Sequence, residues 1–79
     1  MRTTERLITC VRENDAYSGK MIKIFLYEYA DFRENFDGEE ECYNHTFLVK
    51  CDELDLEEWY DNKQDAMAEL NNTVAYLRW

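Results

Sequence analysis

The clearest alternation of apolar and polar side chains lies in residues 21–30, MIKIFLYEYA. Successive side chains of a β-strand point to opposite faces of a sheet, so Ile22, Ile24 and Leu26 would share one face. The opposite face would carry Lys23, Phe25, Tyr27 and Tyr29. The segment therefore predicts a strand with one aliphatic face and one largely aromatic face.

Two further segments favour strands. Residues 6–12, RLITCVR, are rich in β-branched side chains, which fit a pleated sheet. Residues 42–51, CYNHTFLVKC, alternate again. One face of that strand would carry Tyr43, His45, Phe47, Val49 and Cys51. Three strands are thus expected.

The segments between these strands have the composition of loops. Residues 13–20 are polar and contain Gly19, which indicates a turn. Residues 31–41 contain an Asp37-Gly38 pair, a common signal for a hairpin turn. We therefore expect residues 31–41 to form a loop.

The C-terminal part of the chain predicts a helix. Its apolar residues recur at the helical period: Ala66, Met67, Leu70, Val74 and Leu77. Asp61 and Gln64 are spaced like a capping box at the start of that helix. Residues 54–60 could form an earlier helical turn or a loop, and Trp59 is expected to pack between helix and sheet.

This order of elements predicts a single α+β domain over residues 1–79, with a three-stranded antiparallel β-sheet and one C-terminal α-helix packed on one face. The other face would remain uncovered and would carry Tyr27 and Tyr29. Those rings could pack locally on a half-exposed sheet. They could equally form an interface to a twin subunit or to a target.

Charge divides the chain into two unlike parts. There are 18 acidic and 9 basic residues, which give a formal charge of −9. Residues 28–61 hold 13 acids and two bases, Arg33 and Lys50, for a local charge of −11. Such a surface disfavours nucleic acid and anionic membranes as partners and attracts basic proteins.

Familiar catalytic and metal-binding patterns are missing from the sequence. The single serine, Ser18, lies in an expected turn, and the single histidine, His45, would face away from Cys42 in a regular strand. Cys10, Cys42 and Cys51 are more typical of small buried hydrophobic residues than of zinc ligands. We expect no catalytic site, no cofactor and no metal. The N-terminus lacks an apolar stretch long enough for a signal peptide, so we expect a cytoplasmic protein with reduced thiols.

Two segments, 31–41 and 52–58, are rich in acids, and Phe32, Phe36, Tyr43, Trp59 and Tyr60 lie within or beside them. The acids of these segments are Asp31, Glu34, Asp37, Glu39, Glu40, Glu41, Asp52, Glu53, Asp55, Glu57 and Glu58. A strand advances about 3.3 Å per residue, close to the spacing of about 3.4 Å between phosphates along one DNA strand. Both segments together, with Phe36, Tyr27 and Tyr29 as apolar anchors, are predicted to bind a basic groove that normally holds nucleic acid.

The length, the strand-rich body with one helix and the clusters DFRENFDGEEE and CDELDLEEWYD resemble small acidic phage-encoded inhibitors of the anti-CRISPR type. The resemblance concerns overall character and carries over no individual residue. It implies a binding inhibitor that occludes the nucleic-acid channel of a CRISPR effector subunit in the host cytoplasm. Two alternatives stay open: a regulatory or structural interaction module, possibly a homodimer through the tyrosine-bearing face, and an antitoxin-like neutraliser of a basic toxin.

Overall fold

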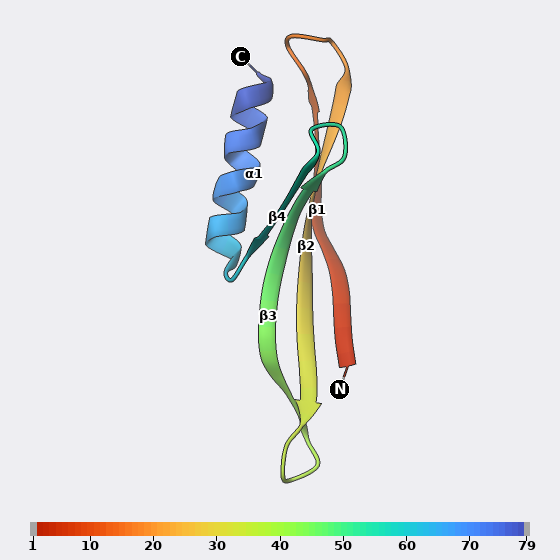
Figure 1. Cartoon of the computed structure of the whole chain (residues 1–79), viewed down its shortest axis with the longest axis vertical. Helices are drawn as coiled ribbons and strands as arrows, with labels where there is room; N and C mark the ends of the chain where they lie inside the picture. The colour runs from red at the N-terminus through yellow and green to blue at the C-terminus, as the bar shows by residue number, and fades with distance from the viewer. Residues whose placement is uncertain (1, 79) are drawn as a thin grey trace.

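Residues 2–78, which the computed structural model describes, form a four-stranded antiparallel sheet followed by one helix (Figure 1). The elements are β1 (Arg2–Asn14), β2 (Met21–Glu34), β3 (Glu40–Cys51), β4 (Leu56–Tyr60) and α1 (Lys63–Leu77). The strands lie in the order β1-β2-β3-β4, so each strand pairs with its neighbours in the sequence. The predicted α+β class, the antiparallel sheet and the C-terminal helix are confirmed, whereas the expected number of three strands is wrong.

The additional strand is β4, where the sequence indicated a helical turn or a loop. It pairs with β3 from Cys51 opposite Leu56 to Phe47 opposite Tyr60. The reversal before it places Asp55 at a φ of 52°, a left-handed conformation that aspartate tolerates better than most residues. Leu56 and Tyr60 pack against the core. Alternation then places Trp59 on the face away from the helix, half exposed at 51%, so its expected position between helix and sheet is wrong.

The core lies between α1 and one face of the sheet. The predicted aliphatic face of β2 is confirmed, since Ile22, Ile24 and Leu26 are all buried. The remaining buried apolar residues of this cluster are Phe47, Val49, Cys51, Ala66, Leu70 and Leu77. Figure 1 shows that α1 covers only the upper part of the sheet in that view.

The helix begins one residue later than the predicted capping box. Asn62 is the N-cap, and its side-chain Oδ1 accepts a hydrogen bond of 2.8 Å from the Asp65 N–H. The Asn62 amide group also donates to the Asp65 carboxylate over 3.0 Å. Asn62 and Asp65 therefore play the roles assigned to Asp61 and Gln64, and Asp65 also places negative charge at the positive end of the helix dipole.

At the other end of the helix, a backbone contact links it to the first hairpin. The Ala16 N–H donates to the Leu77 carbonyl over 2.8 Å. Ala16 lies in the turn between β1 and β2, which Asp15 stabilises by accepting hydrogen bonds from the Tyr17 N–H and the Ser18 hydroxyl. This hydrogen bond therefore fixes the end of the helix, which covers the aliphatic face, to a turn far away in the sequence.

The strands continue well beyond the helix and give the molecule an elongated shape of 55 × 17 × 17 Å. We call the projecting part, residues 2–6, 28–34 and 40–46, the arm (Figure 1). Residues 31–34 and 40–41 were expected in a loop but belong to β2 and β3. Because no helix covers the arm, polar cross-strand contacts take the place of a core there.

Candidate functional site

The two acidic segments predicted to form one surface lie at opposite ends of β3. Residues 31–41 surround the far end of the arm, and residues 52–55 form the turn before β4. The 12 residues of β3 separate them by about 36 Å at about 3.3 Å per residue. The structure therefore does not bring the two segments together, and each has to be considered by itself.

Three of the six acids in the first segment are held by partners within the arm. Glu40 forms an ion pair of 2.6 Å with Arg2, and Glu41 one of 3.0 Å with Arg33. The Asp31 carboxylate accepts hydrogen bonds from the Thr3 hydroxyl at 2.6 Å and the Asn44 amide at 3.0 Å. The Thr3 hydrogen bond, and then that of Asn44, lower the pKa of Asp31 below its ordinary value. These three acids hold the strands together.

Arginine side chains in the arm also lie over aromatic rings. The Arg2 guanidinium lies 4.8 Å from the centre of the Phe32 ring, and that of Arg33 lies 5.3 Å from the centre of the Tyr43 ring. Tyr43 lies at a register shift of β3, which breaks the regular alternation predicted for that strand. Cation–π contacts of this kind add to the ion pairs and fix the two arginines.

The other three acids lie at the end of β2 and in the connection to β3; we call Glu34 and the connecting residues 35–39 the tip. Within residues 2–78, Glu34, Asp37 and Glu39 make no ion pair, and all three are exposed. Between them in the sequence stands Phe36, whose side chain is completely exposed. Phe36 is the most exposed large apolar side chain among residues 2–78, ahead of Tyr17, and it stands between Asn35 and Asp37 in the sequence.

Asn35 determines the shape of the tip. Its side-chain oxygen accepts hydrogen bonds of 3.0 Å from the backbone N–H groups of both Asp37 and Glu39. Gly38 adopts a φ of 80°, as the predicted Asp37-Gly38 turn requires. Phe36 is therefore presented by a defined turn, beside a hollow of about 380 Å³ that Arg33, Glu34 and Glu41 help to line.

The acids of the second segment are more dispersed. Asp52, Glu53 and Asp55 are exposed in the turn after β3, and Asp52 lies 3.9 Å from Lys50. Glu57 and Glu58 are exposed on β4, where neighbouring side chains point to opposite faces. No large exposed apolar residue lies within this turn. The second segment thus has charge without the apolar anchor found at the tip.

Tyr27 and Tyr29 lie on the sheet face that the helix leaves uncovered, as predicted. They continue a line of rings in which Phe25 and Tyr27 are 6.0 Å apart, Tyr27 and Tyr29 are 6.3 Å apart, and Tyr29 and Trp59 are 5.1 Å apart. A straight row across the sheet pairs Leu7 with Tyr27, Tyr27 with Leu48, and Leu48 with Trp59. We call Leu7, Phe25, Tyr27, Tyr29, Leu48 and Trp59 the aromatic face.

Sequence reasoning missed Trp59 and Leu48 as members of this face. Leu48 is 4% exposed although no element covers it, because the surrounding rings shield it. Burial, followed by the neighbouring Glu5 carboxylate, raises the pKa of Tyr29. The alternation of Leu56, Trp59 and Tyr60 would have indicated the position of Trp59 if residues 56–60 had been recognised as a strand.

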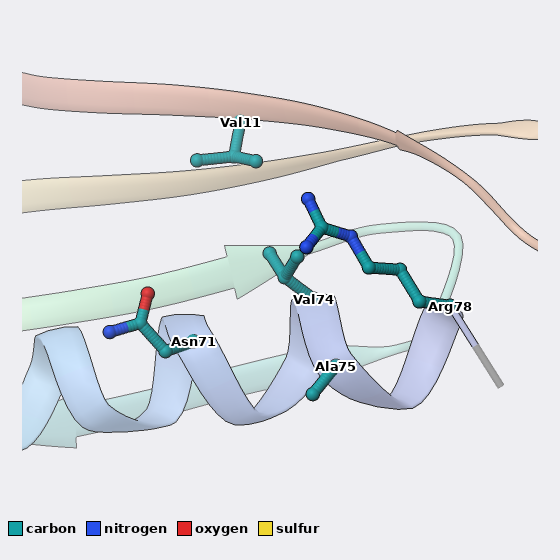
Figure 2. A pocket seen from close by; sticks show the side chains of 5 residues that line it. All are labelled: Val11, Asn71, Val74, Ala75 and Arg78. Atoms are coloured by element: carbon teal, nitrogen blue, oxygen red, sulfur yellow. The ribbon is translucent and has the colours of Figure 1, made fainter.

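An open groove of about 730 Å³ lies between β1 and α1 (Figure 2). It is lined by Val11, Asn71, Val74, Ala75 and Arg78. Arg78 is the one charged residue among them, and its guanidinium is bound to Glu13 at 3.2 Å. The groove therefore presents no pair of groups that could exchange a proton with a substrate.

Residues 2–78 contain neither a cluster of metal ligands nor a helix that could cross a membrane. No group of three or more His, Cys, Asp or Glu side chains is arranged to hold a metal ion. None of the described helical residues form a segment that is both long and apolar enough to cross a membrane. Cys42 is exposed, Cys10 is half-buried and Cys51 is buried, and all three are free thiols.

Comparison with known proteins gave no relationship: the chain matches no protein-family model, no curated protein and no solved structure. The arrangement of its side chains is therefore the basis for any functional inference.

Proposed function

We propose that this protein is a non-catalytic inhibitor that inserts its acidic tip into a groove lined by lysine and arginine, where the target otherwise holds nucleic acid. The proposed target class is a CRISPR effector complex in a host cytoplasm. One observation carries the proposal: Phe36 is completely exposed at the end of a projecting hairpin, between three acids that no base neutralises within residues 2–78.

Phe36 supplies the apolar part of the proposed contact. Aromatic side chains bury about 150–250 Å² in an interface, and at about 25 cal/mol per Å² this contributes about 4–6 kcal/mol before the costs of association are subtracted. Exposed aromatic residues that become buried on binding are typical energetic centres of interfaces. Within residues 34–39, Phe36 is the residue able to provide such a contribution.

Glu34, Asp37 and Glu39 supply the electrostatic part. Carboxylates form short, charge-assisted hydrogen bonds with lysine and arginine, as phosphates do. An acid already paired within its own chain would have to give up that partner first, as Glu40 and Glu41 would. The tip needs no such exchange, and its local charge of −3 favours encounter with a basic groove.

The arm holds the tip at a distance from the rest of the molecule. It extends past the helix, and the molecule is 17 Å across, so the tip can enter a channel while the helix-covered part stays outside (Figure 1). The arm is braced by Arg2–Glu40, Arg33–Glu41 and the hydrogen bonds of Asp31. Such bracing limits the entropy lost when the tip binds.

The test compares two variants with the same number of reversed charges. The tip variant is Glu34→Lys, Asp37→Lys and Glu39→Lys; the control is Asp52→Lys, Glu53→Lys and Glu58→Lys in the second acidic segment. Each is added to CRISPR effector complexes from the native host, and binding of labelled target DNA by the effector is measured. Circular dichroism verifies that both variants fold.

We expect the wild type and the control to block DNA binding and the tip variant to be at least about tenfold weaker. Phe36→Ala should weaken inhibition by a similar factor, as for an interfacial aromatic anchor. Raising the salt concentration from about 50 to about 200 mM should weaken inhibition by the wild type steeply. If both triple variants lost inhibition equally, net charge alone would explain the loss, and the proposed role of the tip would be refuted. No inhibition by the wild type in any effector tested would refute this target class, and binding to a basic toxin instead would favour an antitoxin.

A further inference from the structure

We propose that the aromatic face is an interface to a second copy of this chain, in a symmetric dimer whose two sheets stack with their long axes antiparallel. A sheet with apolar residues on both faces normally has both faces covered. The helix covers the aliphatic face, whereas nothing within residues 2–78 covers the aromatic face (Figure 1). The inference concerns a surface separate from the tip and does not depend on the proposed inhibition.

The apolar residues of this face are continuous across the sheet. The row Leu7, Tyr27, Leu48 and Trp59 contains one member from each strand. Its outer members, Leu7 and Trp59, are 49% and 51% exposed. Phe25 and Tyr29 extend the patch along β2 on either side of Tyr27. A contiguous patch of this kind is typical of an interaction surface.

The charges around the patch indicate which partner fits. By strand register, one end of this face carries Arg12, Lys23 and Lys50, since Lys23 lies opposite Arg12, and Lys50 lies opposite Phe25. Glu57 lies opposite Lys50 on the same face, so this end has a net charge of +2. The other end carries Glu5, Asp31 and Glu41 together with Arg33, which is paired with Glu41, so this end has a net charge of −2. The face is therefore basic at one end, apolar in the middle and acidic at the other end. Such a surface is complementary to itself when a second copy is turned end over end.

The spacing along β2 makes the match specific. Lys23 and Asp31 lie four residues on either side of Tyr27, all on this face. A twofold axis across the strands at Tyr27 places Lys23 of each chain over Asp31 of the other. A dimer with parallel long axes would instead place Lys23 over Lys23. Charge complementarity thus selects the antiparallel arrangement.

The size of the face sets the expected strength. From Lys23 to Asp31 it is about 26 Å long, and the three long strands make it about 14 Å wide, which gives roughly 400 Å² per chain with the short contribution of β4. Interfaces of this size lie at the low end of specific association. We therefore expect a dimer that dissociates on dilution.

Sedimentation of the full chain over concentrations from about 1 μM to about 1 mM tests this. The wild type should change from monomer to dimer across the range. Lys23→Glu places two acids over one another at both contacts, and Asp31→Lys places two bases there. Each variant alone should associate at least about tenfold more weakly, as repulsion between like charges requires.

The deciding sample is an equimolar mixture of Lys23→Glu and Asp31→Lys chains. In an antiparallel heterodimer of these two variants, both contacts again join opposite charges, so association should return to about the wild-type level. Leu7→Ser, at a half-exposed site, should weaken association while circular dichroism shows the native fold. A wild-type chain that stays monomeric throughout, or a mixture that associates no better than either variant, would overturn the proposal.

Discussion

Replacing Leu70 by alanine tests how much of the stability depends on docking of the helix. Leu70 is 2% exposed and lies between α1 and the sheet, with Leu77 as the other large buried side chain of that helix. The change removes about three buried carbon groups at about 0.8 kcal/mol each. With the cavity that remains, we expect a loss of about 3 kcal/mol in the free energy of unfolding. At about 0.05–0.15 kcal/mol per residue, the whole chain has only about 4–12 kcal/mol.

The loss is measured by urea denaturation, with far-ultraviolet circular dichroism for the helix and fluorescence of Trp59 for the sheet, in a Trp79→Phe background. Asn72→Ala is the matched control, because Asn72 is exposed on the same helix. Its unfolding free energy should change by less than about 0.7 kcal/mol, the range of helix propensities. A loss below about 1 kcal/mol for Leu70→Ala would show that the helix does not depend on this contact.

Three further outcomes follow from individual side chains. Cys42 is exposed and should react rapidly with a thiol reagent. Cys51 is buried, and burial raises the pKa of its thiol, so it should react only as fast as the chain opens. Equal reaction rates of the two thiols would contradict the packing. The pKa of Asp31 is lowered in the folded chain, so its contribution to stability is complete above pH about 4 and is lost as the pH falls through the lower folded value. Asp31→Asn should therefore flatten the acid limb of a stability–pH profile, and an unchanged limb would argue against the shift. Asn62→Ala should lower the unfolding free energy by about 1 kcal/mol, whereas Asn62→Asp should retain most of it, as thermal melts would show.

The sequence predicted the parts of the fold in which one face is buried. In β2, Ile22, Ile24 and Leu26 alternate with polar or aromatic residues because the helix covers one side only. That period was readable without a structure. The strand β4 could not be recognised from the sequence, because its acids have low strand propensity and its conformation depends on pairing with β3.

The strand ends within the arm were not recognised from the sequence for a related reason. Residues 31–34 and 40–41 lie outside the cover of the helix, so no burial pattern marks them as strand. Their pairing depends on partners far away in the sequence, such as Arg2 for Glu40. Local reading therefore assigned them to a loop.

The sequence indicated which residues belong to the candidate site, but it did not indicate how they are arranged in space. The acids and Phe36 are visible in the sequence, but the distance between the two acidic segments depends on the length of β3. The split of the first segment into acids that brace the arm and acids at the tip depends on Arg2, Arg33, Thr3 and Asn44. These partners become apparent only when the strand register is known.

The backbone contact between Ala16 and Leu77 has a consequence for synthesis of the chain. Each strand pairs with the next one in sequence, so the sheet can assemble from local hairpins, a topology that favours rapid folding. The helix is translated after all four strands and returns to the first hairpin. Until the ribosome releases α1, the nascent sheet exposes Ile22, Ile24 and Leu26, and during that interval it is open to aggregation or to binding by a chaperone.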